Sequence, residues 1–388
     1  MGTVAEAKAR LSRRSAALKP SLHETVKRLL SLADVRIDGD RPWDIQVHDE
    51  GLYARVLAEG ALGLGESYMD GWWDCDQLDE FFHRVLSARI EANVRPSSEL
   101  PSLVRARLLN LQKRTRAYQI GERHYDIGND LFQRMLDPLM TYSCGYWKEA
   151  ATLQEAQEAK LDLVCRKLGL QSGMRVLDIG CGWGGTAKFA AERHGVEVVG
   201  ITVAQEQVKL AREMCRGLPV EIRLQDYREV DEKFDRVLSI GMFEHVGTKN
   251  YRTYMRVVRD CLKDEGLFLL HTIGGNRNVR RTNAWTERYI FPNSVLPTAK
   301  QIAAAVEGLF VLEDWHNFGT DYDRTLMCWF RNFDDAWDNL KTRYDERFHR
   351  MWRYFLLSSA GSFRARAAQL WQIVLSPRGV AGGHRSVR

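Results

Sequence analysis

The segment VLDIGCGWGG, residues 176–185, decides the fold of this chain of 388 residues. Its first part, Val176–Ile179, is an apolar run typical of a buried strand, and a helical pattern follows its last glycine. Four glycines within six residues separate the two. Glycines at such a turn let a ligand approach the backbone closely, at the positive end of the next helix. The segment therefore predicts a strand, a ligand-binding turn and a helix.

Strand and helix patterns alternate on both sides of this segment from about residue 150 onward. We expect strands at 174–180, 196–202, 220–226, 234–246 and 266–273, with helices between them. Regular alternation of this kind predicts an α/β fold, a parallel sheet with helices on both faces. Residues 310–333 are expected to close the sheet as two strands joined by a long loop. Such a terminal antiparallel hairpin is a feature of the Rossmann-like class I methyltransferase fold.

The first 100 residues or so predict a small mixed domain. An amphipathic helix is expected at about 22–32, followed by a turn and a short strand within 38–49. The stretch 51–75 is rich in aromatic residues, and four of its glycines are expected to mark turns: Gly60, Gly63, Gly65 and Gly71. Prolines then indicate a boundary, and a basic helix follows as a linker. The predicted domains are 1–103, a membrane-associated domain; 104–121, the linker; and 122–388, the catalytic domain.

Charge is unevenly distributed along the chain. Lys and Arg outnumber acids by seven to two in 1–28 and by six to one in 103–123, while 347–388 contains eight Arg and no acid. By contrast, 31–80 holds three basic residues against thirteen acids. Basic blocks attract phospholipid headgroups or nucleic acid, although each block could instead be an ordinary solvated helix face.

The chain contains no run of about 18 apolar residues and no apolar secretory signal at its start. Its seven cysteines are scattered, and none forms a C-x-x-C pair. This pattern argues against a disulfide framework and against a zinc site, and it suits a reducing cytoplasm. We therefore expect a cytoplasmic protein without a metal, whose contact with lipid is peripheral, on the inner face of the membrane.

The glycine spacing alone does not identify the ligand, because Gly180, Gly182 and Gly185 also fit a dinucleotide fingerprint. A dinucleotide site usually has an acid at the end of the second strand, and here that strand ends in Thr202. Asp178 instead completes, with Gly180, Gly182 and Gly184, the D-x-G-x-G-x-G pattern of class I methyltransferases. We expect Asp178 near the ammonium end of S-adenosylmethionine. The pattern favours a methyltransferase over a dehydrogenase.

With these motifs in order, the chain resembles the bacterial cyclopropane-fatty-acyl-phospholipid synthases over nearly its full length. The matching segments are LGLGESYMDGWW, HYDIGNDLF, YSCGYW, VLDIGCGWGG, GMFEHVG, LLHTIG, YIFPN, EDWHNFG and SFRAR. The resemblance implies S-adenosylmethionine as methyl donor and the cis double bond of a phospholipid acyl chain as acceptor. It also implies a bicarbonate ion in the active site, and a homodimer.

The resemblance also implies the site residues. The cofactor would be bound by Tyr142, Ser143, Asp178, Gly180, Gly182, Gly184, Thr202, Gln207, Gln225, Asp226 and Tyr227. Bicarbonate would be held by the side chains of Cys144, Glu244, His271 and Tyr322 and by the backbone of Ile273.

Position in the predicted sheet supports two of these residues. Glu244 follows the run VLSIGM and His271 follows GLFLL, so both lie at the carboxyl ends of predicted strands, where such folds place ligands. There His271 could donate to an oxyanion, and Glu244 could accept the proton of bicarbonate. Cys144 could instead be a small buried hydrophobe, and His271 a core histidine. His245 is expected on the opposite side of a strand, in a structural role.

The reaction predicted for this family needs a dry pocket, because the acceptor is a weakly nucleophilic alkene. Aromatic faces can stabilise the carbocation that methyl transfer leaves. Candidates are Tyr142, Tyr146, Trp147, Phe243, Trp285, Tyr289, Phe291, Trp315, Phe318 and Tyr322. The segment before SFRAR holds Ser359 and no cysteine, so no nucleophile is expected there.

For membrane contact, the N-terminal domain, the linker and the Arg-rich tail are expected to meet anionic headgroups and to couple the domains. The tail could instead be a helix packed on the catalytic domain. Two rival functions are a lipid methyltransferase giving a methyl-branched or methylene product, and an RNA methyltransferase. An RNA methyltransferase is expected to carry an N-P-P-Y motif after the fourth strand, and this chain has GMFEHVG there instead. We therefore predict no nucleic-acid partner. A non-catalytic lipid-binding scaffold is disfavoured by the intact cofactor motif.

Overall fold

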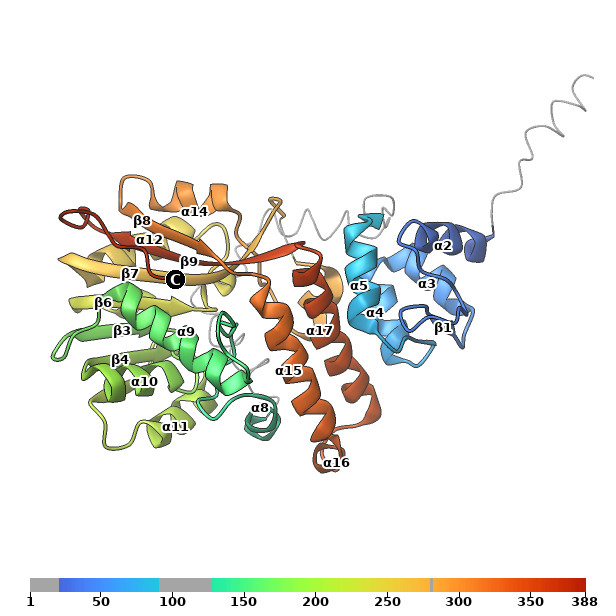
Figure 1. Ribbon diagram of the computed structural model, residues 1–388, viewed down its shortest axis with the longest axis horizontal. Coiled ribbons are helices and arrows are strands. Elements are labelled where there is room, and N and C mark those ends of the chain that lie inside the picture. The colour runs from blue at the N-terminus through green and yellow to red at the C-terminus, as the bar shows by residue number, and fades with distance from the viewer. Residues whose placement is uncertain (1–20, 91–127, 280–281) are drawn as a thin grey trace, which may run out of the picture.

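The computed structural model describes residues 21–90, 128–279 and 282–388. Its largest part is a seven-stranded sheet. The strands are β3 (Arg175–Ile179), β4 (Glu197–Thr202), β5 (Val220–Leu224), β6 (Phe234–Ile240), β7 (Leu262–Gly275), β8 (Val311–Asn317) and β9 (Ala368–Ser376). They lie in the order β5-β4-β3-β6-β7-β9-β8 (Figure 1).

Strands β5, β4, β3, β6 and β7 are parallel to their neighbours, whereas β9 is antiparallel to both β7 and β8. The predicted terminal hairpin exists, but its second strand is β9. Only the first half of 310–333 is a strand, and Asp321–Asp335 forms helix α15. The reason is the apolar period: Tyr322, Leu326, Trp329 and Phe333 are all buried at helical spacing.

Helices cover both faces of the sheet, as the alternation predicted. One face carries α9 (Leu153–Leu168), α10 (Gly185–His194) and α11 (Gln205–Met214), and the other carries α12 (Tyr251–Cys261) and α14 (Ala299–Val306) (Figure 1). Alternate strand residues supply the two cores. On β7, Leu269 packs with the α9 and α10 side, while Phe268 and Leu270 pack with the α12 side.

The described N-terminal part is mainly helical. It contains α2 (Leu22–Ser31), β1 (Gln46–Val47), α3 (Gly51–Glu59), α4 (Ala61–Met69), β2 (Trp73–Asp74) and α5 (Leu78–Ser87). Of the four glycines expected at turns, Gly60 and Gly71 have positive φ, but Gly63 and Gly65 lie inside α4. A Cβ at Gly65 would lie 2.3 Å from Trp285, so this glycine allows an indole to pack on the helix.

Two long helices, α15 and α17 (Glu346–Arg364), stand between the sheet and α2–α5 (Figure 1). Shorter helices nearby are α8 (Asn129–Met135), α13 (Ala284–Tyr289) and α16 (Trp337–Leu340). One apolar core includes side chains of α4, α5, α8, α15 and α17 together, so the N-terminal part is packed on the rest of the chain.

The arginines of α17 pair with the acidic N-terminal stretch. Arg347 contacts Asp70 at 3.0 Å, Arg350 contacts Asp74 at 2.7 Å and Arg364 contacts Asp79 at 2.7 Å. Arg350 also donates to the backbone carbonyls of Tyr68 and Trp73. These contacts agree with the predicted coupling of the domains. They engage three of the arginines that were also expected to meet headgroups.

The predicted domain boundaries, after 103 and after 121, and the basic linker helix lie outside the described residues, so they stay predictions. Within the described residues, no helix combines the length and the apolar character needed to cross a membrane.

Candidate active site

The glycine turn after β3 forms the floor of a pocket at the carboxyl ends of the parallel strands. Gly180, Gly182 and Gly184 have φ values of 84°, 55° and 88°, which glycine adopts without strain. Gly185 begins α10, and a Cβ there would lie 1.9 Å from the carbonyl oxygen of Leu139. The turn is therefore held against the loop that forms the opposite wall.

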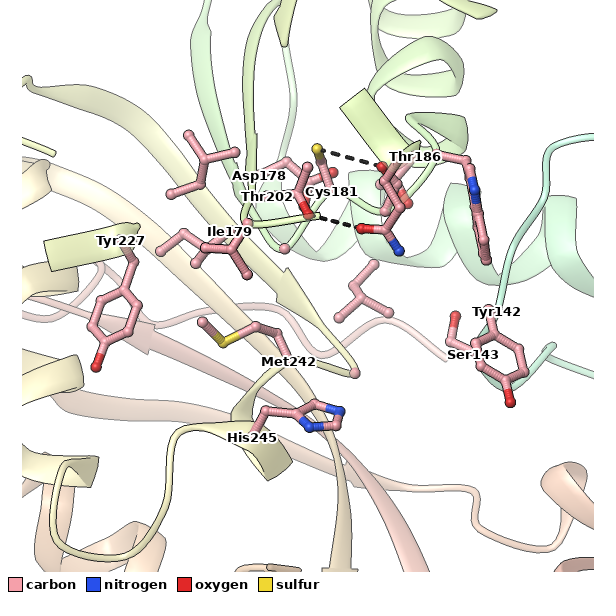
Figure 2. A pocket seen from close by; sticks show the side chains of 18 of the residues that line it. Tyr142, Ser143, Asp178, Ile179, Cys181, Thr186, Thr202, Tyr227, Met242 and His245 are labelled. Atoms are coloured by element: carbon pink, nitrogen blue, oxygen red, sulfur yellow. Dashed lines mark hydrogen bonds between the residues drawn. The ribbon is translucent and has the colours of Figure 1, made fainter. Parts of the chain in front are cut away.

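The pocket brings together nearly all the residues predicted to bind the cofactor. Its walls include Tyr142, Ser143, Asp178, Gly180, Gly182, Thr202, Gln207, Gln225, Asp226 and Tyr227 (Figure 2). Gly184 does not line it: a Cβ there would lie 3.1 Å from the sulfur of Cys215, on the side of α11.

Asp178 is the second-to-last residue of β3, and one of its carboxylate oxygens has no hydrogen-bond partner among the described residues. The side chain is buried, and the oxygen without a partner is its Oδ2. Burial raises the pKa of Asp178 to about 7, against the opposing field of Lys160. A buried carboxylate of this kind is stabilised by a cation from outside, such as a ligand ammonium.

Polar side chains at and after the ends of β4 and β5 line the next part of the pocket. The Thr202 hydroxyl donates to Gln207 Oε1 at 2.7 Å, which leaves the amide N–H groups of Gln207 for a ligand (Figure 2). Gln225 donates to the carbonyl of Glu229, and Asp226 accepts from the backbone N–H of Arg228. The last bond caps the short 3-10 helix η2 (Tyr227–Glu229).

The residues predicted to hold bicarbonate, which we call the catalytic cluster, are Cys144, Glu244, His271, Ile273 and Tyr322. Glu244 contacts Ile273 directly, and Cys144 and Glu244 each adjoin in sequence a residue of the pocket wall, Ser143 and His245. Glu244 is buried in the 3-10 helix η3 (Phe243–His245), directly after β6 and Gly241. Its Oε1 accepts from the backbone N–H of Ile273 at 2.6 Å, while its Oε2 has no partner among the described residues. Burial raises the pKa of Glu244 to about 7.

His271 lies on β7, the strand next to β6, and is also buried. Its Nδ1 is 3.3 Å from Nε2 of Gln372 on β9, while its Nε2 has no partner among the described residues. Burial, with the nearby cations Lys160 and Lys167, holds the pKa of His271 well below its usual range. If the Gln372 amide donates to Nδ1, the neutral ring carries its proton on Nε2.

The thiol of Cys144 is fully buried and donates to the carbonyl of Gly145 at 3.1 Å. Burial raises the pKa of this thiol well above its usual range, so it is unsuited to act as a nucleophile. Tyr322, on α15, packs its ring against Phe363, with 4.6 Å between the ring centroids. These residues come from a loop, the strand β7, the 3-10 helix η3 and the long helix α15.

The predicted aromatic set does not surround one place. Phe318 packs against Tyr146 at 5.3 Å and His271 at 5.8 Å between centroids, so these rings adjoin the catalytic cluster. Phe243 and Trp315 belong to the separate core on the α12 face.

The model of the family described as mycolic acid cyclopropane synthetase matches residues 112–373. The chain belongs to this family.

Within the family, the chain is 55% identical to the cyclopropane-fatty-acyl-phospholipid synthase of Escherichia coli, over 93% of this chain and 94% of that protein. It is 32% identical to the tuberculostearic acid methyltransferase UfaA1 of Mycobacterium tuberculosis, over 85% of this chain and 82% of that protein. The crystal structure of mycolic acid cyclopropane synthase CmaA1 with SAH and CTAB superposes with a TM-score of 0.62. It shares 31% identity and covers 67% of this chain and 98% of that one.

These findings confirm the predicted resemblance and the predicted class I methyltransferase fold. They also confirm the predicted enzyme class of the family, a cyclopropane synthase that uses S-adenosylmethionine.

Sequence reasoning misplaced His245 and overlooked several neighbours of the site. The expected strand 234–246 ends at Ile240, since Gly241 has a φ of 67°, and His245 lies in η3 on the pocket wall. Burial lowers the pKa of His245 to about 4, so the ring is neutral. Gln157 and Lys160, both wholly buried on α9, were also missed. No local signal in the sequence marks them, because polar residues on a helix are usually exposed.

Proposed function

We propose that this protein transfers a methylene group, derived from the methyl of S-adenosylmethionine, to the cis double bond of unsaturated phospholipid acyl chains. The product is a cyclopropane ring. The observation that carries the proposal is the pairing of a glycine-floored pocket with an adjoining buried cluster that presents unsatisfied polar atoms of Glu244 and His271. The high identity to the synthase of Escherichia coli supports the same acceptor.

The residues of the pocket fit the cofactor. When bound, S-adenosylmethionine supplies an electrophilic methyl group on a sulfonium cation. The carboxylate of Asp178 would accept the ammonium of its amino-acid end, and the free amide of Gln207 would donate to a ribose hydroxyl. Gln225–Tyr227 line the part of the pocket expected to receive the base.

The catalytic cluster fits a small oxyanion that also carries a proton. Bicarbonate, when bound, would supply the base that takes the proton whose loss closes the ring. Nε2 of His271 would donate to the anion, and Oε2 of Glu244 would accept the anion's proton. The N–H of Ile273 already donates to Glu244 and its carbonyl accepts from the Thr272 hydroxyl, so Ile273 would act by orienting the carboxylate of Glu244.

The alternative is a methyl-branched or methylene product from the same scaffold. One relative in the family is named a tuberculostearic acid methyltransferase, so the scaffold alone does not fix the product. Ring closure and a methylene product both require loss of a proton from the carbocation, whereas a methyl-branched product requires a hydride. The buried Glu244 and His271 therefore favour loss of a proton over capture of a hydride.

Membrane contact is proposed to use the basic block 103–123, since arginines of α17 are engaged with N-terminal acids. We further propose a homodimer on the cytoplasmic face of the membrane, by analogy within the family. Reversing charge at Arg105, Arg107, Lys113, Arg114 and Arg116 should reduce sedimentation with anionic vesicles. Reversal at the exposed Lys300 is the control, and equal sedimentation of the two variants would contradict this role.

The deciding experiment incubates the purified protein with methyl-labelled S-adenosylmethionine and vesicles of unsaturated phospholipid. The fatty acids are then analysed by gas chromatography and mass spectrometry, with saturated vesicles as the control. We expect a labelled product heavier by one methylene, with a ring in place of the double bond. A labelled branched or methylene product would favour the alternative. Absence of transfer to any lipid, with cofactor binding intact, would refute the proposed acceptor.

A further inference from the structure

Helix α9 carries two buried lysines on one face, seven residues apart. Both Lys160 and Lys167 have wholly buried side chains. Lys167 lies 3.5 Å from a carboxylate oxygen of Asp314 and 3.0 Å from Nδ1 of His316. Lys160 instead donates to the hydroxyl oxygen of Ser143 at 2.9 Å, and no carboxylate of the described residues lies within ion-pair distance of it. An ammonium buried without an adjacent carboxylate is costly, so its retention suggests a use.

The contact with Lys160 determines where the Ser143 hydroxyl can donate. An ammonium has only donors, so the oxygen of Ser143 accepts and its own proton must point elsewhere. Gln157 holds the backbone carbonyl of Ser143 at 2.7 Å, which fixes the residue from behind. Ser143 lines the cofactor pocket, whereas Lys160 does not (Figure 2). The hydroxyl proton is therefore available to a ligand, and the cation behind it strengthens that donor.

The pocket thus offers opposite charges to one end of a ligand. Asp178 on β3 presents an unsatisfied carboxylate oxygen, and Lys160 is close enough to interact with it electrostatically. Arg228, a cation that does line the pocket, pairs with Asp226 at 3.0 Å, after β5. A carboxylate and a cation-backed hydroxyl that line the same pocket match the two charges of an amino-acid zwitterion.

We infer that Lys160 is a positioning residue for the carboxylate at the amino-acid end of the cofactor. It turns the Ser143 O–H toward that carboxylate and supplies the positive field that compensates its charge. Asp178 takes the ammonium of the same group. This inference rests on the proposed use of S-adenosylmethionine, and it assigns a role to a side chain that does not itself touch the ligand.

The test is a pair of ligands that differ only in the carboxylate. Binding of S-adenosylhomocysteine and of its decarboxylated analogue, S-adenosyl-3-thiopropylamine, is measured by calorimetry on the full chain. Lys160→Met should weaken S-adenosylhomocysteine by about 10- to 100-fold and leave the analogue within about threefold. Any change in the ionisation of Asp178 acts on both ligands, so the ratio of affinities isolates the carboxylate.

Matched variants separate this role from packing. Lys167→Met removes the other buried lysine of α9 and should leave the ratio unchanged. Ser143→Ala should lower the ratio, and combining it with Lys160→Met should add little, because the two act in series. If Lys160→Met does not fold, Lys160→Gln tests the same charge while keeping a donor for Ser143.

The outcomes are distinct. An equal loss for both ligands in the Lys160 variants, or an unchanged ratio, would overturn the inference. Equal affinity of the wild-type protein for both ligands would also overturn it, since no carboxylate would then be recognised. If neither ligand bound the wild-type protein, the proposed function itself would fail.

Discussion

The cofactor pocket and the catalytic cluster meet at the loop 141–146, but the chain builds them differently. The pocket is made largely of backbone and of residues that directly follow β3, β4 and β5. The catalytic cluster is made of side chains whose positions are more than 170 residues apart in sequence, from Cys144 to Tyr322. The pocket is built from short local segments at neighbouring strand ends, whereas the catalytic cluster forms only once the whole sheet and α15 are packed.

The largest effect should come from the catalytic cluster. Glu244→Gln should lower turnover by about 100- to 10,000-fold, because the amide cannot accept the proton that the carboxylate takes. The affinity for S-adenosylhomocysteine should stay within about twofold, since Glu244 is not on the pocket wall. Turnover assays and calorimetry on one preparation check this. A parallel loss of cofactor affinity would show that the two sites are not separable.

Glu244→Gln should also be more stable to unfolding than the wild-type protein at alkaline pH. Burial raises the folded-state pKa of Glu244 to about 7 from the ordinary value of 4.5, so the folded protein binds the proton more tightly than the unfolded chain. The stabilisation from this proton is fully present below pH 4.5 and is lost as pH rises through 7. By pH 8 the wild-type protein has lost about 3 kcal/mol of its free energy of unfolding in this way.

Urea unfolding at pH 4.5 and at pH 8 measures this difference. Glu244→Gln should unfold at higher urea than wild type at pH 8 and at about the same urea at the lower pH. Asp178→Asn, in the cofactor pocket, should behave alike, because burial also raises the pKa of Asp178 to about 7. If either substitution changed the free energy of unfolding equally at both pH values, the acid would not be buried in its charged form.

A smaller effect is expected from the backbone of the pocket. Gly185→Ala would place a Cβ 1.9 Å from the carbonyl of Leu139, and both residues line the pocket. Relief of this clash should cost about 1–3 kcal/mol of stability and weaken cofactor binding. Gly173→Ala is the control, because a Cβ there meets nothing within 4 Å, although its φ of 82° carries some strain. Unchanged cofactor affinity in Gly185→Ala would contradict a rigid pocket floor.

The smallest effect should come from the partner of His271. Gln372→Met removes the amide that contacts Nδ1 at 3.3 Å, and turnover should fall by about fivefold as the ring loses its orientation. Gln372→Glu should instead favour a charged imidazole, because a carboxylate accepts a proton from Nδ1. Its pH–rate profile should therefore differ from that of Gln372→Met. Identical profiles would leave Gln372 a packing residue only.

The sequence predicts the pocket better than the cluster, for a physical reason. A strand, a glycine turn and a helix are fixed by neighbours in the chain, so Asp178, Gly180 and Gly182 could be assigned from spacing. Nothing local indicates that Gln372 and His271 are paired across two strands, since their register depends on the whole sheet. The second strand expected within 310–333 is instead the start of α15, because its aromatic residues suit either structure and only their period of burial reveals a helix.

Lys160 illustrates a different limit. A single lysine within a helical pattern is usually solvated, and no local signal distinguishes Lys160 from the exposed positions of α9. Which face of the helix is buried depends on the sheet beneath it. The role of such a residue therefore emerges only after packing, from what its ammonium contacts.

Strand β9 is the last strand of the sheet to be synthesised, yet it lies inside the sheet and not at its edge. This strand, Ala368–Ser376, is inserted between β7 and β8, which are made earlier and do not pair with each other. During translation β7 must leave one edge open, and β8 has no neighbour, until β9 has emerged from the ribosome. The histidine of the catalytic cluster gains its Gln372 partner at the same moment. Ribosome-bound chains that end before residue 368 should therefore hold the cofactor pocket strands together yet lack a completed sheet, with the exposed edge of β7 a target for chaperones.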